Sequence, residues 1–180
     1  MQMSKNAIIF HGTGGNPDVC WYQWVAGELK VKGYRVSIPY YPTLNKEAVE
    51  TFLPHVYEDN IIDSETVLIG HSGGAALILS VLEHSSVKIR QAILVAGYAT
   101  PPNTSQEPVL QAAYDWNKIR AHAEEFYFIN SITDPYGCDD KQGRLMFDQL
   151  GGTQIIRNDG HFGDYNQPFP TFELVNNLIA

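Results

Sequence analysis

One short stretch near the middle of the chain constrains the fold more than any other. Residues 66–69 form an apolar, β-rich run that leads directly into Gly70-His71-Ser72-Gly73-Gly74, and an almost wholly apolar helical segment follows over residues 75–82. A serine at such a junction lies in a sharp turn between a strand and a helix, with its hydroxyl exposed above the sheet. Gly70 and Gly73 are expected to be necessary because a side chain at either position would collide with a neighbouring element. The pattern predicts a nucleophilic Ser72; the plain alternative is a tightly packed glycine-rich turn.

Strand-like and helix-like segments alternate along the whole chain. The predicted strands cover residues 6–10, 34–38, 66–69, 90–96, 126–130 and 153–157, and the predicted helices cover residues 21–32, 46–57, 75–82, 116–123, 141–150 and 172–179. Pro54 is expected to kink the second helix or to end it early. Alternation of this kind favours one α/β domain over residues 1–180, with a six-stranded parallel sheet covered by helices on both faces. In such sheets the functional site lies at the carboxyl ends of the strands.

Composition excludes several classes of partner. The formal net charge is −8, whereas proteins that bind nucleic acid or anionic membranes carry basic patches. No apolar run approaches the roughly 20 residues of a membrane-spanning helix, and the first residues lack the apolar core of a signal peptide. Cys20 and Cys138 have no metal-type or redox-type spacing and are expected to be free thiols. These features predict a soluble cytoplasmic protein.

A serine hydroxyl needs a neutral histidine to take its proton. The six histidines are His11, His55, His71, His84, His122 and His161. Only His161 lies in a loop after the last predicted strand, the place of the base in a chain with the order serine, acid, histidine. His71 is expected to point away from the base, and His11 to shape the loop after the first strand. The other three fall in predicted helices and are expected at the surface.

A carboxylate must hold the imidazole in the correct tautomer. Asp134 follows the fifth predicted strand, and Pro135 keeps it out of helical geometry. The competing carboxylates have simpler explanations: helix capping for Asp139 and Asp140, and turn formation for Asp159 and Asp164. Asp134 is therefore the predicted acid.

The oxyanion of a tetrahedral intermediate needs two N–H donors. Gly73 follows the candidate nucleophile and supplies one. The glycine-rich turn His11-Gly12-Thr13-Gly14-Gly15 supplies the other, with Thr13 preferred and Gly14 in reserve. This turn matches neither the dinucleotide-binding nor the phosphate-loop pattern, so nucleotide binding is disfavoured.

Substrate specificity is less well determined by the sequence. The insert over residues 98–115 lies where a cap is usually found but is too short for a large lid, which predicts a small, open site. Aromatic side chains are candidates for the pocket wall, with core packing as the alternative for each: Tyr98, Tyr114, Trp116, Tyr136 and Phe162. If the substrate carries an amine, an acidic residue should recognise it, and the candidates are Asp18, Glu107 and Asp115.

Several motifs spread over nearly the whole chain occur together in one known family. They are the turn over residues 11–17, the Trp21-x-x-Trp24 helix running to Gly33, the turn over residues 70–74, the segment Asp115-Trp116-Asn117-Lys118-Ile119-Arg120, Asp134-Pro135 and Gly160-His161-Phe162. This combination resembles the retinoblastoma-binding protein 9 type of small serine hydrolase, which has the α/β-hydrolase fold with little or no cap. The resemblance implies a triad of Ser72, Asp134 and His161, ester or amide substrates, and no cofactor or metal.

The sequence thus favours a serine hydrolase that acts on small ester, or amide, substrates through an acyl-enzyme. Two alternatives stay open. One is a peptidase or amidase for small amine-bearing substrates. The other is a non-catalytic binding protein on the same fold, because a fold does not dictate activity.

Overall fold

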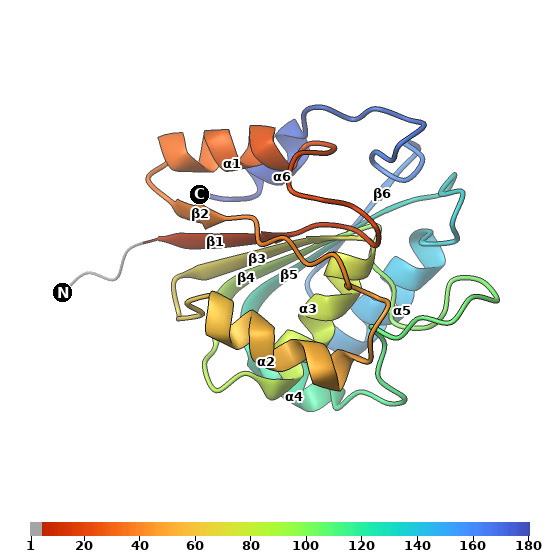
Figure 1. The fold of residues 1–180 in the computed structure, drawn as a ribbon, viewed down its shortest axis with the longest axis horizontal. Helices are drawn as coiled ribbons and strands as arrows, with labels where there is room; N and C mark the ends of the chain where they lie inside the picture. Colours follow the sequence, from red (N-terminus) through yellow and green to blue (C-terminus); the bar gives the residue numbers. More distant parts are fainter. Residues whose placement is uncertain (1–4) are drawn as a thin grey trace.

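Six strands form one parallel, open sheet in the order β2-β1-β3-β4-β5-β6 (Figure 1). The computed structural model describes residues 5–180. The strands are β1 Asn6–Phe10, β2 Arg35–Ser37, β3 Thr66–His71, β4 Ile89–Val95, β5 Ala123–Ser131 and β6 Thr153–Arg157. The order of the strands reverses between β1 and β3, so the carboxyl ends of these two strands mark the point where such sheets hold their sites.

Helices cover both faces of this sheet, as the alternating pattern predicts. They are α1 Tyr22–Val31, α2 Val49–Asp59, α3 Gly73–His84, α4 Trp116–Ala121, α5 Asp140–Leu150 and α6 Glu173–Asn177. Helices α1 and α6 lie on one face, and α2, α3, α4 and α5 lie on the other (Figure 1). Among the described residues, no helix is long and apolar enough to cross a membrane.

The central strands are buried on both sides. All residues of β1 and β3 are buried, and α3 is buried from Gly73 to Leu82. This explains why their sequences are continuously apolar rather than alternating. The segment between β4 and α4 contains no helix or strand, so the sheet carries no cap domain.

Most element boundaries differ by one or two residues from the sequence-based prediction, and the starts of α2 and β5 differ most. Helix α2 begins at Val49 and continues past Pro54 to Asp59. Pro54 is exposed, and the buried side chains Phe52, Leu53 and Val56 anchor the opposite face of the helix, so tertiary packing outweighs the hydrogen bond that proline removes. Strand β5 begins at Ala123, where the prediction still had helix, because backbone pairing with β4 extends to Ile89 and Ala123.

Candidate functional site

Ser72 lies between the end of β3 and the first turn of α3 in a strained backbone conformation. Its φ of 54° and ψ of −119° lie outside the regions that non-glycine residues favour. The Ser72 N–H donates to the Val95 carbonyl of β4 (2.9 Å), and the Ser72 carbonyl accepts from the Ala75 N–H (2.9 Å). The backbone on either side of the serine is therefore fixed by hydrogen bonds. This is the strand-to-helix geometry that presents a serine hydroxyl above a sheet.

Glycines make this sharp turn possible. A Cβ at Gly70 would collide with the backbone of Gly74 and Ala75, and a Cβ at Gly74 would collide with the carbonyl oxygens of Phe10 and His11. At Gly73 the colliding atom is the side-chain Oγ1 of Thr13. The sequence-based interpretation assigned the tight contacts to Gly70 and Gly73. The structure confirms Gly70 and shows that Gly74, rather than Gly73, meets rigid backbone.

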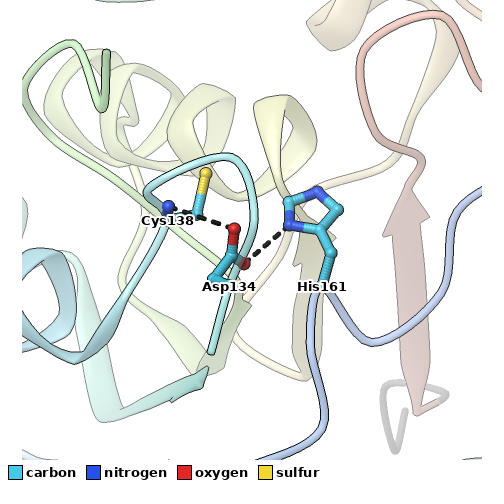
Figure 2. A group of neighbouring side chains, drawn as sticks. All are labelled: Asp134, Cys138 and His161. Carbon is cyan, nitrogen blue, oxygen red and sulfur yellow. Dashed lines mark hydrogen bonds and ion pairs between the residues drawn. The ribbon is translucent and has the colours of Figure 1, made fainter. Parts of the chain in front are cut away.

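Asp134 and His161 form a hydrogen-bonded pair, with 2.7 Å between Asp134 Oδ2 and His161 Nδ1 (Figure 2). Their side chains are nearly sequestered from solvent, at 0% exposure for Asp134 and 8% for His161. The second carboxylate oxygen, Oδ1, accepts from the N–H groups of Tyr136 (2.8 Å) and Cys138 (3.3 Å). Because a carboxylate can only accept, the proton of a neutral His161 lies on Nδ1, which leaves Nε2 free to take a proton.

The competing carboxylates are engaged elsewhere. Asp139 caps α5 through the N–H groups of Lys141 and Gln142, and Asp140 lies in the first turn of that helix. Asp159 pairs with Arg157 (2.8 Å), and Asp164 accepts from the Tyr136 hydroxyl (2.9 Å).

The sequence suggested that the His71 side chain points away from His161. This expectation is wrong, because the two residues are in contact. The two rings lie 4.9 Å apart, and His71 Nε2 lies 2.7 Å from the His161 carbonyl oxygen. Since that carbonyl can only accept, Nε2 carries the His71 proton, and Nδ1 accepts from the Tyr22 hydroxyl at 2.6 Å. The Gly12 N–H in turn donates to the Tyr22 oxygen (3.2 Å). A chain of hydrogen bonds therefore joins the loop after β1 to the loop that holds His161.

Burial keeps His71 uncharged. Its side chain lies inside the molecule, and burial, aided by the neighbouring His161 ring, lowers the pKa of His71 to about 3. His11 is also buried, and burial lowers its pKa. It bonds the Gly12 carbonyl (2.8 Å) and accepts from the Tyr41 N–H (3.0 Å), which fits the predicted role in shaping this loop.

The two candidate oxyanion donors lie side by side. A Cβ built on Gly73 would lie 3.4 Å from the Thr13 nitrogen. Among residues 5–180 neither the Thr13 N–H nor the Gly73 N–H has a hydrogen-bond partner. Gly14 has nothing within 4 Å of its would-be Cβ, and its carbonyl accepts from the Tyr165 hydroxyl (2.6 Å). The geometry therefore favours Thr13 over Gly14 as the second donor.

Ser72 and His161 line the same cavity, which has a volume of about 530 Å³. Tyr98 and Tyr136 also line it, as the sequence predicts, but Tyr114, Trp116 and Phe162 do not. Tyr114 and Trp116 pack against each other outside the cavity, with tilted rings whose centroids lie 5.2 Å apart. Phe162 is fully buried against Phe169 and Phe172, and its assignment to the pocket wall is wrong.

Several lining residues escaped the sequence-based search. They are Cys20, Tyr22, Asn45, Cys138 and Tyr165. No motif marks them, because Tyr22 lies at the start of α1 and the others lie in loops whose folded path brings them to the cavity. Of the three acidic candidates for amine recognition, only Glu107 lines the cavity, whereas Asp18 bonds Gln23 at the surface and Asp115 caps α4.

Both cysteines are free thiols, as predicted. Burial raises the pKa of the Cys138 thiol, so it stays protonated and is a poor nucleophile despite its place in the cavity. Ligand atoms of Asp134, Cys138 and His161 all lie within 4.8 Å of one another, the one such group of potential metal ligands among residues 5–180 (Figure 2).

Comparison with known proteins agrees with this geometry. The chain is 27% identical to the serine hydrolase RBBP9 of Rattus norvegicus over 170 residues, which covers 90% of this chain and 89% of that protein. It is 28% identical to the putative hydrolase YdeN of Bacillus subtilis, covering 99% and 96% of the two chains.

Solved structures establish the fold. The crystal structure of the ydeN gene product from B. subtilis superimposes with a TM-score of 0.85 at 23% identity and covers 97% of this chain and 96% of that one. Alpha/beta hydrolase domain-containing protein 10 from mouse superimposes with a TM-score of 0.64 at 14% identity, over 87% and 81% of the chains. The chain therefore has the α/β-hydrolase fold. The model of the serine hydrolase family matches residues 7–179, and the chain belongs to that family.

Proposed function

We propose that this hydrolase cleaves small esters through a triad of Ser72, His161 and Asp134 and a covalent acyl-enzyme. The observation that carries the proposal is that Ser72 and His161 line one cavity while Asp134 accepts a hydrogen bond from His161 Nδ1. A serine in strained elbow geometry, an imidazole with a fixed tautomer and two free N–H groups are the parts that acyl transfer requires.

The reaction proceeds in two halves. His161 Nε2 takes the Ser72 proton as Ser72 Oγ attacks the substrate carbonyl, and the N–H groups of Gly73 and Thr13 stabilise the oxyanion. His161 then gives that proton to the leaving alcohol, which departs and leaves the acyl group on Ser72. A water molecule, deprotonated by His161, attacks the acyl carbonyl. The acid leaves, and Ser72 regains its proton.

The cavity supports small substrates. Its volume of about 530 Å³ and the lack of a cap provide no long channel for an acyl chain. We expect p-nitrophenyl acetate and butyrate to be hydrolysed with a higher kcat/KM than long-chain emulsions, and Ser72→Ala to remove this turnover while the protein stays folded. Full activity of the alanine variant would refute the assignment of the nucleophile. Faster turnover of long-chain esters would refute the substrate class.

Glu107 supports a second candidate, an amidase or peptidase for amine-bearing substrates. Its Oε2 accepts from the Tyr98 hydroxyl (2.6 Å) and from Asn45 Nδ2 (2.5 Å), which fixes the carboxylate at the cavity wall. Asp164 also lines the cavity, and the described lining residues include no Lys or Arg. Such a wall attracts a cationic amine.

An aminoacyl arylamide and its N-acetylated analogue separate the two candidates. If the enzyme recognises an amine, it prefers the free amine, and Glu107→Gln reduces this preference while hydrolysis of a neutral ester falls less. Equal turnover of both arylamides would exclude recognition of the amine and leave the esterase as the single proposed function.

A further inference from the structure

The side chains around the Asp134–His161 pair include a third group that the proposed reaction does not use. Cys138 lies four residues after Asp134, is 2% exposed, and lines the cavity together with His161. Its backbone N–H is bonded to Asp134 Oδ1, which fixes the loop that carries both residues. In Figure 2 the Asp134 carboxylate lies between the Cys138 and His161 side chains. A thiol, a carboxylate and an imidazole therefore gather at one wall of the site.

We propose that Asp134, Cys138 and His161 form an inhibitory Zn²⁺ site. The inference concerns regulation of the proposed active site and rests on the proposed function. Sulfur, imidazole nitrogen and carboxylate oxygen are the three ligand types that zinc prefers in proteins. The three ligand atoms lie within 4.8 Å of one another, and tetrahedral zinc with its usual bond lengths needs them roughly 3.3–3.8 Å apart. Asp134 Oδ2 and His161 Nδ1, 2.7 Å apart in the hydrogen-bonded pair, must therefore separate to admit the ion, and the more distant ligand atoms must approach one another.

The cavity provides the route and the remaining coordination position. Cys138 and His161 both line it, so an ion that enters from solvent reaches them directly, and water in the cavity supplies a fourth ligand. Glu107 and Asp164 add negative charge to the same cavity, which favours entry of a cation.

Zinc at this position stops the reaction through the tautomer of His161. In the active arrangement Nδ1 holds the proton, bonded to Asp134 at 2.7 Å, and Nε2 is the free acceptor. Zinc takes the Nδ1 lone pair, so the imidazole proton moves to Nε2, and the Cys138 thiol releases its proton to water. The imidazole then has no lone pair for the Ser72 proton. Zinc also occupies the Asp134 oxygen that orients the ring.

Cys20 supplies a matched control, because it is the other free thiol that lines the cavity. We expect Zn²⁺ to inhibit hydrolysis of a short ester reversibly, with activity restored by a chelator. The apparent Kd for Zn²⁺ should rise at least about tenfold in Cys138→Ala and stay within about threefold of the parent in Cys20→Ala, each variant being compared with its own metal-free rate. If Cys138→Ala does not fold, Cys138→Ser takes its place. Equal inhibition of both cysteine variants overturns the inference.

A binding measurement separates failure of this inference from failure of the proposed function. Co²⁺ added to the Ser72→Ala protein should produce a thiolate-to-cobalt charge-transfer band that excess Zn²⁺ removes and that is lost when Cys138 is also replaced by alanine. The band requires no catalysis, so it supports the site even if no ester is cleaved. An active esterase whose Ser72→Ala variant shows no such band overturns the zinc site and leaves the triad untouched.

Discussion

The two halves of the candidate site are built in different ways. On the nucleophile side, at the ends of β1 and β3, the geometry depends on backbone hydrogen bonds and on glycines, which have no side chain. Gly74, for example, allows α3 to approach the carbonyls of Phe10 and His11. On the base side, at the ends of β5 and β6, side chains hold the loops together. Ser131 Oγ accepts from the Asp159 N–H (3.0 Å), and Thr133 Oγ1 donates to Asn158 (2.8 Å). Rigid packing thus holds the serine, and a polar network holds the acid and the base.

The chain from Gly12 through Tyr22 and His71 to the His161 carbonyl connects the halves. Its side chains are buried and uncharged, so little water competes for their donors and acceptors. We infer that it keeps His161 in register with the loop after β1. The difference between the halves implies that substitution of the acid on the base side should reduce turnover, whereas substitution of the tightly packed glycines beside Ser72 should reduce stability.

The largest expected effect is on turnover, from Asp134→Asn. An asparagine at this position can donate to Nδ1, which favours the wrong imidazole tautomer, and we expect kcat to fall about 10³- to 10⁴-fold on a short ester. Asp139→Asn is the matched control because asparagine caps a helix as well as aspartate does, and Asp139 caps α5. Steady-state kinetics of the two folded variants decides the question. Similar losses in both, or a loss below tenfold in Asp134→Asn, would mean that Asp134 is not the acid.

Gly74→Ala tests the packing of the nucleophile side. The added methyl group meets the carbonyl oxygens of Phe10 and His11, so we expect the free energy of unfolding to fall by about 1–3 kcal/mol in a urea titration. Gly27→Ala in α1 is the control. Gly27 is exposed and has nothing within 4 Å of its would-be Cβ, so this change should stabilise the protein by about 0.5–1 kcal/mol. If Gly74→Ala were as stable as Gly27→Ala, the tight turn would not be a packing requirement.

A further effect concerns the connection between the halves and depends on pH. The pKa of His71 is lowered to about 3 in the folded protein, below its unfolded value of roughly 6.5. Between these values the unfolded chain binds a proton that the folded chain does not, so its contribution to stability is complete above pH 6.5 and is lost as the pH falls. The slope from this one group is at most about 1.4 kcal/mol per pH unit. His71→Gln should flatten the pH dependence of the unfolding free energy between pH 6.5 and 4.5, and an unchanged slope would show that His71 is not held neutral.

The difference between the halves also explains what the sequence could predict. The turn around Ser72 is encoded in contiguous residues, so its motif, strand and helix were recognisable together. Asp134 and His161 followed from their places after the last two predicted strands, because parallel strands end at the same edge. His71 was misjudged since its partner lies 90 residues away and the contact depends on the path of the last loop. Trp116, at the start of α4, and Phe162, in the loop after β6, were misassigned for a similar reason: no local pattern tells which side such an aromatic residue faces.

Labelling with a fluorophosphonate probe, followed by mapping of the adduct by mass spectrometry, tests the proposed triad most directly. An activated serine forms a covalent adduct, whereas an ordinary serine does not. We expect a single adduct on Ser72, its absence in Ser72→Ala, and strongly reduced labelling in His161→Ala. Absence of labelling in well-folded protein, or an adduct on another residue, would contradict the proposed triad and favour a binding protein that retains the hydrolase fold.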